Sequence, residues 1–165
     1  MNDFFPETDY KVPNTSNYLK LTEGSHKFRV LSSAVVGYEY FTTENKPVRS
    51  KEPFDDEPTD IKSDSTIKHF WAFVVYNYDA KKIQILELTQ KSIMNQMKGY
   101  MDNPDWGNPK TYDFTIKRTG SSKNDTEYSV MPSPHKPIDT EIVTKYESMK
   151  IDLNALFTGA DPFNK

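Results

Sequence analysis

Cysteine is absent from the 165 residues of this chain. Its absence excludes disulfides, thiolate metal sites and cysteine nucleophiles, and it is compatible with a reducing compartment. Long apolar runs are absent too, since no stretch approaches the roughly 18 residues that a membrane-spanning helix needs. The polar start MNDFFPETDYK lacks the basic and apolar regions of a secretory signal peptide. We therefore expect a cytoplasmic protein without a membrane partner.

Glycine is scarce as well, and none of the six glycines belongs to a phosphate-cradling loop. The three histidines, His26, His69 and His135, lie in different segments, and no H-x-x-x-H or Asp-x-Asp pair occurs. These absences favour a binding protein over an enzyme. We expect no catalytic residues, no metal site and no cofactor.

The formal net charge of -3 is distributed unevenly along the chain. Residues 42–66 carry seven acidic and four basic residues, whereas residues 17–41 and 67–131 have a small excess of Lys and Arg. A mildly positive body with an acidic insertion gives a modest electrostatic case for nucleic acid. A further hypothesis is that the acidic stretch 52–60 competes with DNA for the binding groove.

Aromatic residues are abundant, and five of them fall within the stretch HFWAFVVYNY, residues 69–78. Alternate residues of a strand point to opposite faces, and both faces here are apolar. The small side chains of Ala72 and Val74 favour a crowded barrel interior for their face. Trp71 and Phe73 are therefore predicted to form an exposed platform that stacks on nucleic-acid bases. The alternative is that both rings belong to the core.

Hydrophobic periodicity predicts the remaining elements. Residues 26–41 alternate as a strand that Gly37 interrupts, and a bulge at this glycine would turn Tyr38 and Tyr40 outward. Residues 42–66 are expected to form a long loop. Further strands are expected at 67–78, 82–89, 111–118 and 125–131, and helices at 90–101 and, capped by Asp139, at 139–149.

This order predicts an all-β protein with a five-stranded OB-fold barrel. One short helix lies between strands three and four, a long loop joins strands one and two, and a C-terminal helix and tail follow. An SH3-like barrel is a weaker alternative because it offers little room for that helix. The expected domains are a flexible N-terminal arm at 1–17, the OB fold at 18–137, and a C-terminal helix and interaction tail at 138–165.

Basic residues are placed where a phosphate track across such a barrel would need them: Lys27, Arg29, Lys46, Arg49, Lys68, Lys117 and Arg118. Any single lysine of this set has solvated surface as its alternative role. Arg49 and Arg118 are the strongest candidates, because a guanidinium can both stack on a ring and form two parallel hydrogen bonds to a phosphate.

Trp106 lies among turn-forming residues and is predicted to close the end of the barrel.

Several stretches resemble the single-stranded DNA-binding, helix-destabilising proteins of tailed bacteriophages. These are YLKLTEGSHKFRVLSSAVVGYEYF, KPVRS, IKHFWAFVVYNY, IQILELTQKSIMNQM, WGNPKTYDFTIKRTG, TEYSVMPSPHKP and ALFTGADPF. They cover roughly residues 18–137 and the tail. The resemblance implies an OB fold that coats single strands without sequence preference during phage DNA replication and recombination, in the cytoplasm of the infected bacterial host.

The resemblance also implies a C-terminal tail that contacts other replication or recombination proteins, and it is compatible with self-association along DNA. The tail residues assigned to that contact are Leu156, Phe157, Asp161, Pro162 and Phe163. The side-chain charges of the tail balance to zero, so apolar recognition is favoured over electrostatic mimicry of DNA. The zinc site of one branch of such proteins requires cysteines that are absent here.

From the sequence we expect a non-enzymatic protein that binds single-stranded DNA by aromatic stacking and phosphate contacts. The main alternative is a protein-interaction module of a replication or virion complex that binds no nucleic acid. A strand-processing enzyme is the third and weakest alternative.

Overall fold

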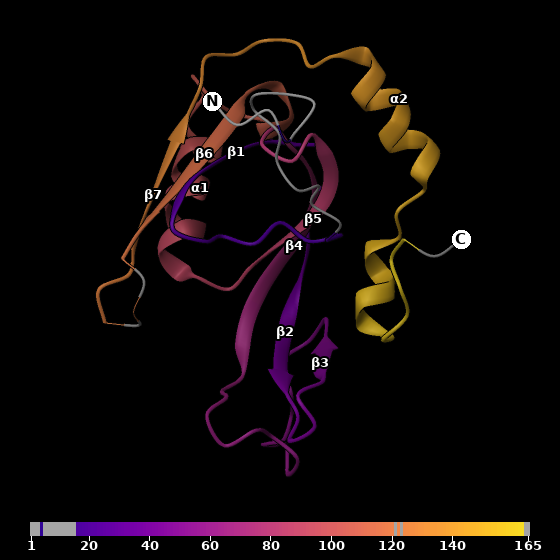
Figure 1. Ribbon diagram of the computed structural model, residues 1–165. Coiled ribbons are helices and arrows are strands. Elements are labelled where there is room, and N and C mark those ends of the chain that lie inside the picture. Colours follow the sequence, from indigo (N-terminus) through magenta and orange to yellow (C-terminus); the bar gives the residue numbers. More distant parts are fainter. Residues whose placement is uncertain (1–3, 5–15, 121, 123, 164–165) are drawn as a thin grey trace.

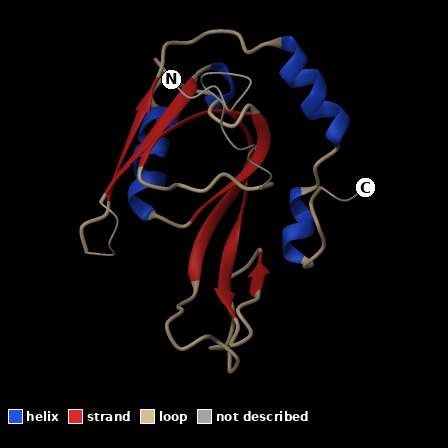
Figure 2. Cartoon of the chain, viewed as in Figure 1, coloured by secondary structure: helices blue, strands red, loops and turns tan. Residues whose placement is uncertain are grey.

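The structure is a computed structural model that describes residues 4, 16–120, 122 and 124–163. Its strands are β1 (Gly24–Val30), β2 (Val35–Phe41), β3 (Pro47–Ser50), β4 (Lys68–Asn77), β5 (Lys82–Leu88), β6 (Asp113–Thr119) and β7 (Glu127–Pro132). The helices are α1 (Lys91–Asp102) and α2 (Thr140–Met149), with short 3-10 turns η1 (Pro109–Thr111) and η2 (Leu153–Phe157). All strand pairs in the sheet are antiparallel, which confirms a mainly β fold with helices beside the sheet (Figure 2).

Strand β4 is the centre of the sheet. One of its edges pairs first with β2, with Val36 opposite Trp71, and then with β1, with Phe28 opposite Asn77. Its other edge pairs with β5. The predicted first strand, residues 26–41, is therefore two strands. The break lies at residues 31–34, where the Ser32 hydroxyl accepts the hydrogen bond from the Val74 amide.

The expected bulge at Gly37 is not observed, because Gly37 pairs with Phe70 in the middle of β2. Its lack of a side chain serves packing instead. A Cβ at this position would overlap the Ser50 carbonyl oxygen and lie 2.9 Å from the Phe157 ring. Glycine therefore lets β3 and η2 approach β2 closely.

The predicted long loop contains the short strand β3, which pairs with β2 and extends the sheet into a projecting ribbon of β2, β3 and the first half of β4 (Figure 1). The acidic stretch folds back on this ribbon. Phe54 packs edge-on against Tyr40, with ring centroids 5.3 Å apart, and the Tyr40 hydroxyl donates to Asp60 at 3.0 Å.

Strands β6 and β7 extend the sheet from the other edge of β1. Among the described residues, β7 does not pair with β5, and the closed five-stranded barrel is not formed by backbone pairing. Helix α1 lies against β7 instead. Gln96 on α1 donates to the Tyr128 carbonyl at 3.0 Å and accepts from the Val130 amide at 2.9 Å.

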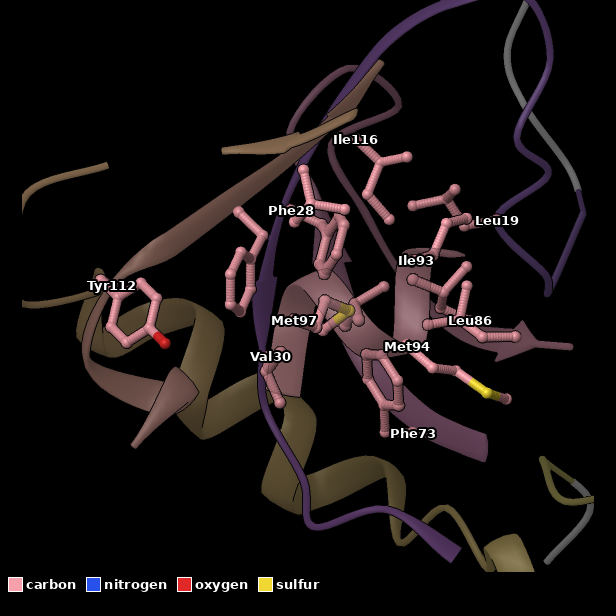
Figure 3. Packing of buried hydrophobic residues seen from close by; sticks show 14 residues of the cluster. Leu19, Phe28, Val30, Phe73, Leu86, Ile93, Met94, Met97, Tyr112 and Ile116 are labelled. Carbon is pink, nitrogen blue, oxygen red and sulfur yellow. The ribbon is translucent and has the colours of Figure 1, made fainter. Parts of the chain in front are cut away.

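The two faces of β4 pack into two separate hydrophobic clusters. The first lies under α1 and includes Phe28, Phe73, Leu86, Met97 and Phe114 (Figure 3). The second cluster joins the opposite face of β4 and β5 to the C-terminal segment, which we define as residues 146–163. Figure 1 shows this segment in yellow alongside the sheet.

The ends of the described chain also bind β5 and the second cluster. The backbone of residues 17–19 pairs with Ile85, with N to O distances of 2.9 Å in both directions. The predicted arm 1–17 otherwise lies outside the described residues, apart from Phe4 and Ser16.

Helix α2 begins at the predicted cap, where the Asp139 carboxylate accepts from the Glu141 amide at 2.9 Å.

Candidate nucleic-acid interface

Four side chains share one face of the β2–β4 ribbon, and we call them the ribbon face: Val36, Tyr38, His69 and Trp71. They form two directly opposed cross-strand pairs, Val36 with Trp71 and Tyr38 with His69. The Tyr38 and His69 rings are 5.1 Å apart between centroids. Val36 is 50% exposed, His69 is exposed, and the two larger rings are half-buried. The ribbon face is therefore a reachable aromatic surface.

The reason for this exposure is the length of β4. Trp71 and Phe73 point to the same side of the strand, but Phe73 is buried in the first cluster, whereas Trp71 is only partly buried against it. On the edge of β4 that faces β1 and β2, residues 68–71 pair with β2 alone. The same face thus changes from interior to surface along one strand.

A cavity of about 310 Å3 continues the ribbon face toward the core. Trp71 and Phe73 line it from β4, and Met97 and Met101 line it from α1. The break between β1 and β2, together with η1, forms its rim, which includes Lys110. The ribbon face and the cavity share Trp71 and form one continuous surface.

The spacing along the ribbon face suits bases that are not stacked on one another. Side chains two residues apart on one face of a strand are separated by about 7 Å. Stacked nucleotides rise by only about 3.4 Å per strand. Two adjacent bases that contact separate cross-strand pairs must therefore be unstacked from each other, unlike adjacent bases in duplex DNA.

Two aromatic residues that the sequence analysis assigned to base stacking are in the interior. Phe73 is only 3% exposed, because α1 covers it. Tyr40 is 7% exposed, because Phe54 and Asp60 of the acidic stretch close over it. Phe73 therefore lies in the core, whereas Tyr38 and Trp71 remain reachable.

Arg29 is likewise not on the surface, and its side chain is 1% exposed. Its Nε donates to Asp113 Oδ1 at 2.7 Å, and its two other nitrogens donate to the carbonyls of Lys110 and Lys136. The Tyr78 hydroxyl donates to the same carboxylate oxygen, and burial together with this contact raises the pKa of Tyr78 to about 12. As folded, Arg29 offers no donor to a phosphate.

Arg49 lies between two carboxylates on the ribbon side opposite the ribbon face. It donates to Glu39 at 3.0 Å and to Glu87 at 2.9 Å. Burial raises the pKa of Glu39 to about 8, and the neighbouring Glu87 adds to this effect against the opposing influence of Arg49. The guanidinium already donates to both carboxyl groups, so the predicted phosphate contact at Arg49 would require these hydrogen bonds to break.

The other predicted basic residues do not gather at the ribbon face. Lys117 is exposed on β6, and Arg118 beside it donates to the Leu21 carbonyl at 2.9 Å. Lys27 on β1 lies 4.0 Å from Asp113 and over the Tyr78 ring. Lys46 and Lys68 are exposed at the ribbon, Lys46 within 3.9 Å of Glu44.

The C-terminal tail is docked rather than free. Leu156 is 4% exposed, and Phe157 packs on Phe70 with ring centroids 5.8 Å apart. Pro162 is buried, and the Phe163 ring contributes to the second cluster, while Asp161 is exposed. The face of β4 and β5 that carries Phe70 is therefore covered by the protein's own C-terminal segment.

His69, Val36 and the cavity were not assigned to the site from the sequence, although strand alternation places His69 on the same face as Trp71. Met97 and Met101 looked like an ordinary core stripe on a helix. Their contact with an open cavity depends on where η1 returns to the sheet, which no local pattern encodes.

Trp106 packs against other aromatic side chains and not against the ribbon face. Its ring lies 5.7 Å from His135 in a stacked arrangement and 6.1 Å from Tyr100 in an edge-on one. The His135 ring nitrogens lie within hydrogen-bonding distance of Thr111 and the Asp105 carbonyl. This aromatic group packs at the margin of the first cluster, apart from the ribbon face.

Within the described part of the chain, no helix is both long and apolar enough to cross a bilayer, and no group of three acidic or histidine side chains is arranged to hold a metal ion. In comparisons with known proteins, no family model, curated protein or solved structure matches the chain.

Proposed function

We propose that the protein binds single-stranded DNA without sequence preference, through the ribbon face and the cavity beside it. The observation that carries this proposal is the pair of opposed contacts, Val36 with Trp71 and Tyr38 with His69, on one uncovered face. Aromatic rings stack on any base, and each such contact contributes about 1 to 3 kcal/mol. The resemblance to phage helix-destabilising proteins supports the same activity in DNA replication and recombination, in the cytoplasm of an infected bacterium.

The proposal includes an OB-type barrel. In this interpretation β1 and β2 together are the first strand, β4 and β5 are the second and third, and β6 and β7 are the fourth and fifth. Helix α1 lies between the third and fourth strands, the position that the OB topology gives to its helix. Gln96 spans part of the gap between helix and final strand.

The electrostatic contribution in this proposal is small. The side chains of Arg29 and Arg49 already contact carboxyl groups of the protein. Phosphates would therefore be bound by exposed lysines such as Lys46, Lys68 and Lys110. Affinity should then fall with salt by about 0.7 logarithmic units per phosphate contact for each logarithmic unit of salt. A slope that corresponds to few contacts is expected.

Tryptophan fluorescence tests the proposal directly, because the chain has two tryptophans and only Trp71 lies on the ribbon face. In a Trp106→Phe variant, all tryptophan emission comes from Trp71. Titration with unstructured oligothymidine should quench this emission, and a duplex of equal length should not. The matched Trp71→Phe variant, in which Trp106 reports alone, should show little change.

Absence of binding to oligothymidine, by fluorescence and by a mobility assay, would contradict the proposal. It would favour a second function, a protein-interaction module with an aromatic docking face. The contacts of Arg29 with Asp113, and of Arg49 with Glu39 and Glu87, favour that alternative, because a polyanion-binding protein gains little from guanidinium groups that carboxyl groups already occupy.

A further inference from the structure

The cavity beside Trp71 has the composition of a binding site for a flat, apolar ring. Its volume of about 310 Å3 is at the lower end of the range for small-ligand pockets. Phe73, Met97 and Val30 form its inner lining, and Figure 3 shows these three side chains in the same part of the first cluster. Methionine side chains adapt to the shape of an aromatic ring and make favourable sulfur contacts with it.

The rim of the cavity is polar and positively charged. Lys110 is the one charged residue in the lining, and it is exposed. The Asn108 side-chain oxygen accepts from the Lys110 amide, while its side-chain nitrogen makes no hydrogen bond among the described residues. A ligand with an aromatic ring, carbonyl acceptors on its edge and an attached negative charge matches this arrangement.

We propose that the cavity takes one unstacked nucleobase from the bound single strand, with Asn108 facing the base edge and Lys110 facing its phosphate. This inference rests on the proposed function and adds a defined subsite to it. The ribbon face leads to the cavity through Trp71, so a strand that runs along the ribbon can insert its next base without leaving the protein. An unpaired base costs little to extrude, which makes the subsite selective for single strands.

Methyl NMR of the full-length chain, with 13C-labelled methionine methyls, tests this placement. Met97 and Met101 line the cavity, whereas Met94 on the same helix, Met131 on β7 and Met149 on α2 do not. Met97→Leu and Met101→Leu variants assign the two resonances. On titration with oligothymidine, the ring current of an inserted base should move the Met97 and Met101 signals and leave those of Met94, Met131 and Met149 in place.

A cavity-blocking variant provides a second measurement. Ala34 is exposed on the rim, outside any strand, so Ala34→Phe should fill the opening while the sheet is retained. We expect it to weaken oligothymidine binding about tenfold, the equivalent of one lost base contact. Ala160→Phe, the same change at an exposed alanine outside the cavity lining, is the matched control and should bind like the wild type. An unchanged Met94 methyl signal verifies the fold of both.

The outcomes separate this inference from the proposed function. If oligothymidine quenches Trp71 but the Met97 and Met101 signals stay fixed, the strand lies on the ribbon and the subsite is overturned while the function is kept. Equal affinity of Ala34→Phe and wild type would overturn the subsite in the same way. If oligothymidine binds nowhere, both proposals are wrong. Cavity signals that move with a tryptophan-containing peptide, and not with oligothymidine, would reassign the site to a protein partner.

Discussion

Gln96 provides Val130 with the hydrogen-bond partner that a neighbouring strand would otherwise supply. Its Oε1 accepts from the Val130 amide at 2.9 Å, and its Nε2 donates to the carbonyl of Tyr128 at 3.0 Å. The side-chain amide therefore satisfies both a donor and an acceptor on the edge of β7. This single side chain therefore hydrogen-bonds α1 to the edge of β7.

Replacing Gln96 with leucine should lower the free energy of unfolding by about 1 to 3 kcal/mol, because the Val130 amide loses its acceptor in a buried position. Urea unfolding followed by circular dichroism measures this change. Asn95→Leu is the matched control, since Asn95 is an exposed amide on the same helix and should shift stability by no more than about 0.5 kcal/mol. Equal stability of the two variants would show that the Gln96 contacts carry no net energy.

The Glu39 carboxyl should make the protein less stable as the pH rises from about 4.5 to about 8. Its pKa is near 4.5 in the unfolded chain and about 8 in the folded protein, so the folded state holds a proton that the unfolded state has released. Each pH unit in this window then costs at most about 1.4 kcal/mol. Below the window both states are protonated, and above it both are ionised.

A Glu39→Gln variant tests this titration because glutamine imitates the protonated carboxyl. Urea unfolding between pH 5 and pH 8 should show a flatter profile than the wild type, with the variant more stable at the upper end. Glu44→Gln, at an exposed position, should retain the wild-type profile. A Glu39→Gln profile parallel to that of the wild type would assign the pH dependence to other groups.

Gly37→Ala should destabilise the protein by about 2 kcal/mol or more, because the new methyl group meets the Ser50 carbonyl and the Phe157 ring. Gly99→Ala is the opposite case. Gly99 is exposed within α1, and no atom lies within 4 Å of the position that an alanine methyl would take, so alanine should stabilise by up to about 1 kcal/mol. Thermal unfolding of the two variants gives shifts of opposite sign if this interpretation is correct.

Arg29→Met should cost about 3 to 5 kcal/mol, because it leaves the Asp113 carboxylate buried without its guanidinium partner. Lys27→Met is the control, since this ammonium is 44% exposed and 4.0 Å from the same carboxylate. Its loss should cost no more than about 1 kcal/mol. Similar costs for the two variants, measured by urea unfolding, would contradict the assignment of Arg29 as the main partner of Asp113.

Strongly periodic segments were predictable from the sequence. The methionine stripe from Ile93 to Met101 indicated α1, and Asp139 indicated the start of α2. The division of residues 26–41 was not predictable, because the Ser32 hydroxyl replaces a backbone acceptor only once β4 lies beside it. The pairing of β3 with β2 likewise depends on tertiary contact, since four residues carry too little pattern.

The candidate site was predictable in part. Alternation placed Trp71 and Phe73 on one face, but the point at which α1 stops covering that face separates them into surface and core. The charge of Arg49 and Arg29 was visible in the sequence, whereas their carboxylate partners lie up to 84 residues away. Long-range pairing of charges therefore explains why Arg29 and Arg49 are held by carboxyl groups rather than free on the surface.

The cover that residues 153–163 place over Phe70 has a consequence for synthesis on the ribosome. The sheet residues emerge well before their cover, and the contact between Phe70 and Phe157 closes a loop of more than 80 residues. Until residues 153–163 have left the exit tunnel, the nascent chain exposes an apolar sheet surface. Chains truncated before residue 153 would keep that surface open and are expected to aggregate.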